Sequence, residues 1–562
     1  MKKRAMVLAG LILSAVTIPS FTANVEASAS TGTVFDQIMI CSGKNGSELN
    51  VNWITYERPD GVIVQIAKSA DMENGVFPED KAQSFTGNYV KPGFGRQLNG
   101  KNYYIYDNEA VVKGLAPKTE YVYRVGDGYD WSSAYTYLTP ATDSYKMFVV
   151  ADVHMYDSYH TVAEAQADWG GNLTQLMARH KEDNVSHILA LGDQMQNSDR
   201  QDFIDALLAP SELRNLSFSP INGNHDVTPS HTKQKYFYNL PNVAKSGDEA
   251  YTGYGIEDYY YLYGNTLFVM LNYENILKSK NICGHWEKTF EKATTEFAGQ
   301  YDWIVACTHD PVYGEGATII DTVGMELPND DWKTCENAYA RGKSFIDCCD
   351  KYGVDLVLTG HKHRYARSYF MKGGEIQSVA ETERDGALEF IDPTGTVYVN
   401  SSTSNTFSHY STGSPDDNEL YSRSAFTYDI PWLAKRYWFP EMGGYGRSTY
   451  SMLEADENYL KLTTWEVDRP ENLVDEFVIT KTSIIPDEEQ GGEQGGNHGG
   501  DKVEPPIDSG SSDSSSGDSD SSSSNSGNGG SSTADSGCNS TAGILPLLGL
   551  LPVAFIGLKK ND

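Results

Sequence analysis

Basic side chains are scarce in this sequence: 44 lysines and arginines stand against 77 aspartates and glutamates, which gives a formal net charge of -33. Proteins that bind nucleic acid or anionic lipid use clusters of lysine and arginine to displace the counterions of the phosphates. The deficit of positive charge therefore argues against nucleic acid as a partner. Part of the acidity lies in residues 486–541, which are mostly Gly, Ser, Asp and Glu and predict a flexible linker without a core of its own.

Cysteine is also rare, with 7 residues in a chain of 562. Their spacing matches no zinc knuckle, so they do not predict a cysteine-based zinc site. With Cys538 set aside as the odd one, the others could form up to three disulfides in an oxidising compartment, and the pairing stays open. These six are Cys41, Cys283, Cys307, Cys335, Cys348 and Cys349.

Long apolar runs are confined to the two ends of the chain. Lys2, Lys3 and Arg4 precede an apolar run over 5–19, and this order predicts a secretory signal peptide, residues 1–27, cleaved near Ala27. A membrane anchor is the alternative, but the run is short for a hydrocarbon core of ~30 Å. We therefore expect the protein to be exported.

The C-terminal segment, residues 542–562, consists of an uncharged run followed by Lys559 and Lys560. It resembles a bacterial C-terminal sorting tail, although no LPxTG-type motif is present. Gly537-Cys538-Asn539 before the run resembles the cysteine-containing variety of such signals. A plain membrane anchor is the alternative, with the lysines on the cytoplasmic side. Either interpretation predicts a cell-surface protein that contacts the membrane or cell envelope through this segment.

Residues 36–140 predict an all-β domain. Short alternating apolar runs, such as 49–54, 62–66 and 121–125, are separated by turn signals such as Pro59-Asp60-Gly61. Strands at this spacing are typical of a β-sandwich. The stretch 115–125 resembles a strand of fibronectin type III-like domains.

Residues 144–482 predict an α/β domain, because strand-like and helix-like segments alternate. We expect buried strands at 147–151, 187–191, 303–307 and 354–358, and helices at 162–180, 203–208, 286–297 and 342–351. The pattern predicts a layered sandwich of sheets flanked by helices. An aromatic and Gly-rich insertion, residues 405–446, has no predicted place in it.

Polar side chains follow the four strands above and the segment 219–221, at the point where each ends. Loops at the carboxyl ends of strands in an α/β fold converge on one crevice. Imidazole and carboxylate groups gathered in this way suit zinc, iron or manganese. The polar residues expected there are Asp152, His154, Asp193, Asn224, His225, His309, His361 and His363.

These motifs resemble the signature of the calcineurin-like metallophosphoesterase superfamily, which runs D-x-H, G-D, G-N-H-[DE], H and G-H-x-H in this order. With a β domain in front, the nearest resemblance is to purple acid phosphatases. The resemblance implies two divalent or mixed-valence metal ions. It places one ion on Asp152, His154, Asp193 and His363. The second would lie on Asp193, Asn224, His309 and His361, with Asp193 shared.

His225 has no metal-binding role in this resemblance. It would lie beside the leaving group as a general acid or as a stabiliser of phosphoryl charge, and Asn224 and His225 would contact the substrate. Asp310 is a candidate to orient His309. These residues predict a phosphatase that cleaves small phosphate monoesters by direct attack of a metal-bridging hydroxide.

The sequence departs from purple acid phosphatases at two positions. Those enzymes have G-D-x-x-Y, with a tyrosine that binds ferric iron and gives the colour, whereas this chain has Gln196 there. They also usually have D-x-G where this chain has Asp152-Val153-His154. We therefore expect a colourless enzyme in which the metal pair stays open among Zn, Mn and Fe.

Two other functions remain to be weighed. A phosphodiesterase or nucleotidase would use the same metal site, and fold alone does not choose between these activities. A non-enzymatic display or adhesion protein would predict gaps in the ligand set, and none is missing. The sequence does not indicate an oligomeric state.

Overall fold

The computed structural model describes residues 33–156, 160–227, 233–248, 251, 255–272, 285–313, 338–405, 432–437 and 447–484. These residues all fall within one compact unit. The expected signal peptide 1–27, linker 486–541 and C-terminal segment 542–562 lie outside the described residues, as does most of the insertion 405–446. Within the described ranges, no helix is both long and apolar enough to cross a membrane.

The N-terminal part is a sandwich of two antiparallel sheets, as the alternating sequence pattern predicts. Large apolar side chains such as Trp53, Val64 and Tyr123 alternate along their strands and form a core between the sheets. One sheet has the order β1 (Asp36–Ser42), β2 (Glu48–Thr55), β8 (Tyr106–Lys113), β5 (Asn88–Val90). The other has the order β10 (Tyr135–Leu138), β9 (Glu120–Gly126), β3 (Ile63–Lys68), β4 (Gln83–Thr86). A hairpin joins β6 (Gly95–Leu98) and β7 (Lys101–Tyr104).

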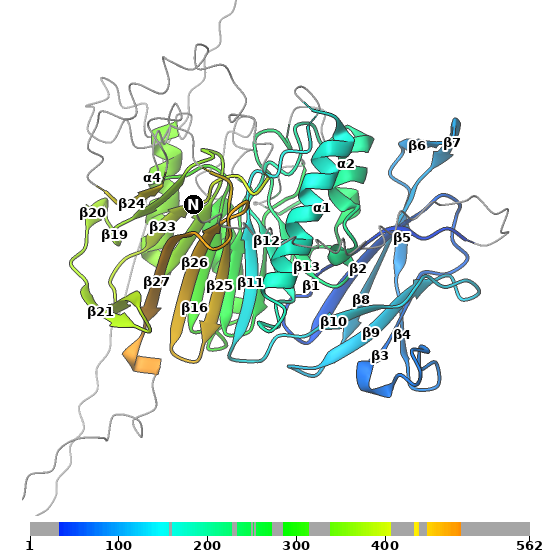
Figure 1. Cartoon of the computed structure of the whole chain (residues 1–562), viewed down its shortest axis with the longest axis horizontal. Coiled ribbons are helices and arrows are strands. Elements are labelled where there is room, and N and C mark those ends of the chain that lie inside the picture. The colour runs from blue at the N-terminus through cyan, green and yellow to red at the C-terminus, as the bar shows by residue number, and fades with distance from the viewer. Residues whose placement is uncertain are drawn as a thin grey trace, which may run out of the picture. The chain divides into compact units, whose positions relative to one another are not determined.

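Two larger sheets form the α/β part, which confirms the predicted fold class (Figure 1). Among the described residues, the first has eight strands in the order β13 (Ser217–Pro220), β12 (His187–Ala190), β11 (Tyr145–Val150), β25 (Thr449–Asp456), β26 (Tyr459–Glu466), β27 (Leu473–Thr480), β22 (Ala387–Ile391), β21 (Ala380–Arg384). The second has seven, in the order β14 (Tyr259–Tyr263), β15 (Thr266–Met270), β16 (Trp303–Cys307), β17 (Leu356–Thr359), β23 (Val397–Asn400), β18 (Tyr365–Ser368), β24 (Leu433–Tyr437). A small hairpin pairs β19 (Met371–Lys372) with β20 (Glu375–Ile376).

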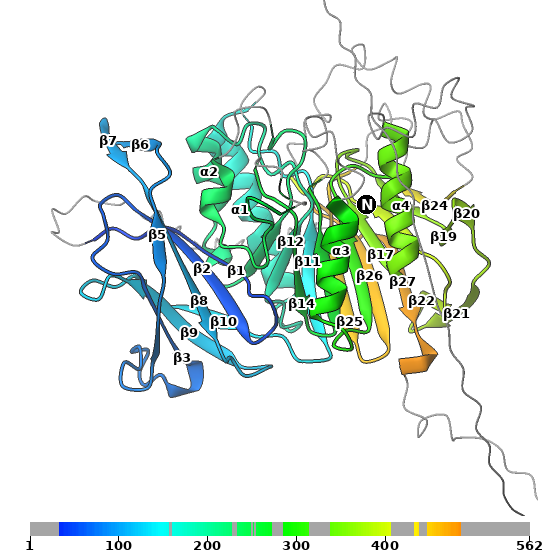
Figure 2. The ribbon, with the colours of Figure 1, turned by 180° about the vertical axis from the view of Figure 1, so that it is seen from behind.

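Helices cover the outer faces of this sandwich. Figure 1 shows α1 (Val162–Arg179) and α2 (Gln201–Leu208) on one side, and Figure 2 shows α3 (His285–Glu296) and α4 (Ala338–Tyr352) on the other. These bounds match the predicted helices to within a few residues. Helix α1 begins at a capping box in which Thr161 and Glu164 satisfy each other's backbone N–H groups.

Alternation along β14 explains how the layers hold together. Tyr259, Tyr261 and Tyr263 belong to the core that also takes in the eight-stranded sheet. The intervening Tyr260 and Leu262 belong to a second core beneath α3 and α4. Both faces of this strand are therefore buried, which is why the sequence here is an almost continuous aromatic run.

The parallel register aligns the strand ends that carry the polar motifs. Val150 at the end of β11 pairs with Ala190 at the end of β12, and Ala190 pairs with Pro220 at the end of β13. In the second sheet, Cys307 of β16 pairs with Leu358 of β17. The loops that follow these strands therefore leave each sheet at the same level.

The cysteines differ from the expectation. Cys41, Cys307, Cys348 and Cys349 are all free and buried, so the three disulfides that the sequence allowed do not all form. Each thiol packs into an apolar core instead, and burial raises the pKa of Cys41 and of Cys348 to about 12. Cys283, Cys335 and Cys538 lie outside the described residues.

Candidate metal centre

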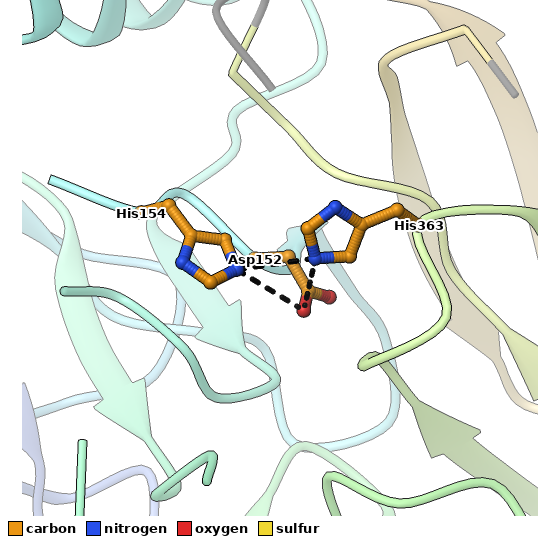
Figure 3. Close-up of side chains that lie close together, drawn as sticks. All are labelled: Asp152, His154 and His363. Carbon is orange, nitrogen blue, oxygen red and sulfur yellow. Dashed lines mark hydrogen bonds and ion pairs between the residues drawn. The ribbon is translucent and has the colours of Figure 1, made fainter. Parts of the chain in front are cut away.

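The first group of converging side chains comes from the loops after β11 and β17. Nε2 of His363 lies 3.2 Å from Oδ1 of Asp152 and 3.1 Å from Nε2 of His154. Figure 3 shows the two imidazoles and the carboxylate turned toward one another. All three side chains are buried. Their donor atoms lie within 4.8 Å of one another, a spacing that suits a shared metal ion.

A second group of the same kind comes from the loops after β12, β16 and β17. It consists of Asp193, His309 and His361, whose donor atoms also lie within 4.8 Å of one another. Oδ1 of Asn224, in the loop after β13, lies 2.8 Å from Nδ1 of His361. An amide oxygen thus adds a further possible ligand to this group.

Asp193 connects the two groups. Its Oδ2 atom lies 3.1 Å from Nε2 of His309 and 3.7 Å from Nε2 of His154. Its Oδ1 atom accepts a hydrogen bond from the backbone N–H of His225 at 2.7 Å. This bond occupies Oδ1, and Oδ2 is the oxygen of Asp193 that faces both groups.

The backbone of the centre is strained at the residues that supply these side chains. Non-glycine residues seldom adopt a positive φ, because Cβ then crowds the backbone. Five of the site residues do so, with φ values between 45° and 75°. They are Asp152, His154, Asp193, His361 and His363. Strain of this kind persists only where the surrounding structure enforces it, and here it turns the side chains toward one another.

Glycines leave room for the two carboxylates. A Cβ atom on Gly223 would lie 2.1 Å from Oδ1 of Asp193, and one on Gly360 would lie 2.5 Å from Oδ2 of Asp152. A Cβ on Gly192 would lie 2.4 Å from Nδ1 of His309. The glycines in the G-D, G-N-H and G-H-x-H motifs are therefore required by the close approach of the neighbouring side chains.

Contacts with residues outside the groups show how the rings of His309 and His361 are turned. Nδ1 of His309 lies 2.7 Å from the carbonyl oxygen of Leu191, so it carries the proton and leaves the Nε2 lone pair available. Nε2 of His361 lies 3.2 Å from Oδ1 of Asp310, which leaves Nδ1 on the side of Asn224. Asp310 thus lies beside His361, and its expected role in orienting His309 stays a prediction.

The surroundings shift the pKa values of two of these side chains, Asp193 and His361. Burial alone would raise the pKa of Asp193, but the His309 imidazole beside it holds this pKa well below the ordinary range. Burial and the neighbouring His309 lower the pKa of His361 to about 2. The carboxylate is thus ionised and the imidazole neutral at neutral pH. Asp226 behaves differently, since burial and the nearby Asp193 charge raise its pKa to about 8.

His225 lies beside the centre and belongs to neither group of donor atoms. Its ring centroid is 5.0 Å from that of His154, and its side chain is partly exposed, as is that of Asn224. Nδ1 of His225 lies 2.7 Å from Nε2 of Gln196. The sequence did not reveal this contact, although the departure at position 196 marks the residue as unusual.

The donor set tests whether a pair of metal ions fits. Imidazole nitrogens and carboxylate oxygens converge in two groups, and these groups contain no thiolate. This mixture suits zinc, iron or manganese and does not suit calcium, which prefers oxygen ligands alone. The structure therefore defines an α/β sandwich with a candidate two-metal centre at the carboxyl ends of its strands.

Comparisons with known proteins agree with this geometry. The family described as calcineurin-like phosphoesterase matches residues 145–365, and the purple acid phosphatase N-terminal domain matches residues 35–139. Residues 145–365 therefore form a calcineurin-like phosphoesterase domain, and a purple acid phosphatase N-terminal domain precedes it. The site residues from Asp152 to His363 all lie inside the first match.

Individual relatives are distant. Acid phosphatase type 7 of Mus musculus is 22% identical over 306 residues, and that of Homo sapiens is 21% identical over 304 residues. The alignments cover 52% of this chain and 63% of each relative, so this chain spans less than two thirds of their length. A purple acid phosphatase from yellow lupin (Lupinus luteus) seeds matches in structure with a TM-score of 0.56 at 14% identity, over 80% of this chain and 75% of that one. This last similarity concerns the fold.

Proposed function

We propose that this chain is a metal-dependent phosphatase that hydrolyses small phosphate monoesters. The observation that carries the proposal is the position of Asp193, whose Oδ2 atom lies within 3.7 Å of imidazoles from both groups of donor atoms. Asp193 would therefore contribute to the binding of both ions. The names of the relatives, which are acid phosphatases, support the same activity.

The assignment of ligands follows from the two groups. Asp152, His154 and His363 would hold one ion together with Asp193. His309, His361 and Asn224 would hold the other, again with Asp193. When bound, such a pair of ions lowers the pKa of a coordinated water and polarises the phosphoryl oxygens.

Asn224 and His225 would contact the substrate. Both are partly exposed, whereas most of the proposed ligands are buried, so they form the accessible side of the centre. The backbone N–H of His225 donates to Asp193, which holds His225 next to the two groups of donor atoms. Its ring could give a proton to the leaving group or donate a hydrogen bond to the charge that develops there.

Metal analysis and a pair of esters test this proposal. The full chain is purified, loaded separately with zinc, manganese or iron, and assayed with p-nitrophenyl phosphate and with bis(p-nitrophenyl) phosphate. We expect about two ions per chain and a higher kcat/KM for the monoester. A higher kcat/KM for the diester would favour the phosphodiesterase or nucleotidase alternative. A chain that holds two ions and hydrolyses neither ester would contradict both.

Export and attachment to the cell surface stay predictions from the sequence. They depend on residues 1–27 and 542–562, which lie outside the described part of the chain. Fractionation of expressing cells, with detection of the full chain in the envelope fraction, would test them.

A further inference from the structure

A short polar segment after β23 lies against the loop that supplies Asp152 and His154. We call residues 403–405 the support segment and residues 151–154 the first metal loop. The support segment has the sequence Thr-Ser-Asn, and all three of its side chains are buried. Because buried polar groups need hydrogen-bond partners, the partners of this segment indicate its role.

The support segment binds the carbonyl groups of the first metal loop. Oγ1 of Thr403 donates a hydrogen bond to the carbonyl oxygen of Asp152 at 2.7 Å, and Nδ2 of Asn405 donates to that of Val153 at 2.9 Å. The backbone N–H of the residue between Thr403 and Asn405 donates to the carbonyl oxygen of Ala151 at 2.8 Å. Three consecutive carbonyl groups of the loop therefore have their partners in the support segment.

The N–H groups of the first metal loop have their partners in a different loop, the one after β12. The N–H of Asp152 donates to the carbonyl oxygen of Gly192 at 3.1 Å, and that of His154 donates to the carbonyl oxygen of Asp193 at 2.9 Å. Asp152 and His154 have φ values of 49° and 45°, and such a backbone persists only where its surroundings enforce it. Without the support segment, the carbonyl groups of this loop would be buried and unpaired, which is rare in native proteins.

The rest of the fold holds the support segment in place. It follows β23 of the seven-stranded sheet, whereas the first metal loop follows β11 of the eight-stranded sheet. The carbonyl oxygen of Thr403 accepts a hydrogen bond from the N–H of Thr449 at 2.8 Å, and Oγ of Ser404 donates to the carbonyl oxygen of Thr449 at 2.8 Å. Thr449 begins β25, which pairs with β11. A paired strand therefore fixes the position from which the segment reaches the loop.

We propose that Thr403 and Asn405 are positioning residues that hold the first metal loop in its positive-φ conformation, so that Asp152 and His154 are arranged for a metal ion before the ion binds. This inference rests on the metal centre of the proposed function and assigns a role to residues outside its ligand set. Preorganisation strengthens binding, because the loop does not have to be ordered when the ion arrives.

The two groups of donor atoms should respond differently to loss of this support. The group that contains His363 takes its other two members from the first metal loop, whereas the group that contains His309 takes none from it. Removal of a hydrogen bond between the support segment and the loop should therefore weaken the binding of one ion and leave the other nearly unchanged. A general loss of stability would not distinguish the two ions in this way.

Three substitutions test the contact of Thr403. Thr403→Val removes the hydroxyl and keeps the shape of the side chain, and Thr403→Ser keeps the hydroxyl. Thr396→Val is the matched control, because Thr396 is equally buried and its Oγ1 donates to a backbone carbonyl oxygen, that of Val354, at the same distance of 2.7 Å. Thr396 precedes β23, at the opposite end of the strand from the support segment. Asn405→Ala tests the second contact independently.

The first measurement is metal binding without substrate. The metal-free full chain is titrated with zinc against a competing chelator, and the two binding steps are assigned with His363→Ala and His309→Ala, each of which removes a proposed ligand of one ion. We expect Thr403→Val and Asn405→Ala to weaken the step that His363→Ala removes, by about 10- to 100-fold, as is typical of residues that orient metal ligands. The other step should be nearly unchanged, and Thr403→Ser and Thr396→Val should bind both ions like the unsubstituted chain. Circular dichroism of each metal-free variant checks that it is folded.

Two results of this titration would overturn the proposal. If Thr403→Val and Asn405→Ala both bind the two ions with unchanged affinity, the support segment does not position the loop. If Thr396→Val weakens the same step as much as Thr403→Val does, the effect is a general loss of stability. Neither result depends on turnover, so a chain that binds two ions without phosphatase activity would contradict the proposed function and leave this test intact.

The second measurement separates metal binding from the chemical step. Thr403→Val should need about 10- to 100-fold more zinc than the unsubstituted chain for half-maximal hydrolysis of p-nitrophenyl phosphate. At saturating zinc its kcat should be close to that of the unsubstituted chain, because the loop regains its conformation once the ion is bound. A lower kcat at saturating zinc with an unchanged zinc requirement would show that Thr403 acts on the chemical step, and would overturn the proposal.

Discussion

Oδ2 of Asp193 lies 3.1 Å from Nε2 of His309, although the two residues follow different strands in different sheets. Asp193 comes after β12 in the eight-stranded sheet, and His309 comes after β16 in the seven-stranded sheet. The centre is therefore built across both layers of the sandwich. Its geometry depends on how the two sheets pack, and not on any one loop.

Replacing Asp193 with asparagine tests this bridge directly. The asparagine side chain would keep an oxygen for the N–H of His225 but would remove the charge that faces both groups. We expect Asp193→Asn to lose at least one ion per chain and to lower kcat/KM by more than the roughly 10- to 100-fold typical of outer-shell partners. Metal content by plasma mass spectrometry and steady-state assays would show this. The exposed Asp347→Asn is a suitable control, and full metal occupancy in Asp193→Asn would mean that the carboxylate does not bridge.

His225 should separate metal binding from turnover. It lies outside both groups of donor atoms but is attached to Asp193 through its backbone N–H. Because alanine keeps that N–H, we expect His225→Ala to retain both ions and to lower kcat about 100- to 1,000-fold, as for loss of one donor in a preorganised site. Metal analysis and kcat are measured on the same sample. Loss of an ion in this variant would show that His225 has been assigned the wrong role.

Gly360 should be intolerant of even one added methyl group. A Cβ there would lie 2.5 Å from Oδ2 of Asp152 and 3.0 Å from the carbonyl oxygen of Leu191. We expect Gly360→Ala to displace Asp152, to lower metal occupancy and activity, and to leave the circular dichroism spectrum unchanged. Gly171→Ala is the control, because Gly171 lies in α1 and a Cβ there meets nothing within 4 Å. That control should be neutral or stabilising by about 0.5–1 kcal/mol. Normal metal binding by Gly360→Ala would show that Asp152 can move without consequence.

Much of this centre could be predicted from the order of the residues. Each polar motif follows an apolar run, and parallel pairing brings the ends of such runs to one level, as Val150 and Ala190 show. The sequence pattern therefore predicts which residues meet. It also predicts the helices and the β-sandwich, because apolar periodicity is a local property that packing preserves.

Contacts within the loops could not be predicted in the same way. Whether Asp310 reaches His309 or His361 depends on backbone angles at single residues, and His361 has a positive φ that its sequence neighbours do not reveal. The contact between Gln196 and His225 likewise joins two separate loops. The number of cysteines does not show which of their sulfur atoms lie close together. Cys41 and Cys307 are buried in strands as apolar side chains.

His187 gives a prediction about pH and stability that is independent of the metal centre. It is fully buried at the start of β12, with Nδ1 2.6 Å from Oγ of Ser217 and Nε2 3.2 Å from the hydroxyl of Tyr261. Burial lowers the pKa of His187 to about 3, from an ordinary value of 6.5. Below pH 6.5, His187 therefore binds a proton in the unfolded chain, whereas in the folded chain it binds one only at about pH 3.

The sign follows from this difference in proton binding. The free energy of unfolding is unaffected by His187 above about pH 6.5, and it falls as pH decreases below that value, by at most about 1.4 kcal/mol per pH unit for one group. His187→Gln removes the titration and keeps a side chain able to hydrogen-bond Ser217 and Tyr261. We expect its unfolding free energy, from urea titrations at about pH 6, 5 and 4, to fall less steeply than that of the unsubstituted chain by about 1.4 kcal/mol per pH unit. Parallel pH dependences for the two proteins would show that His187 is protonated in the folded state, or that the buried site opens as the pH falls.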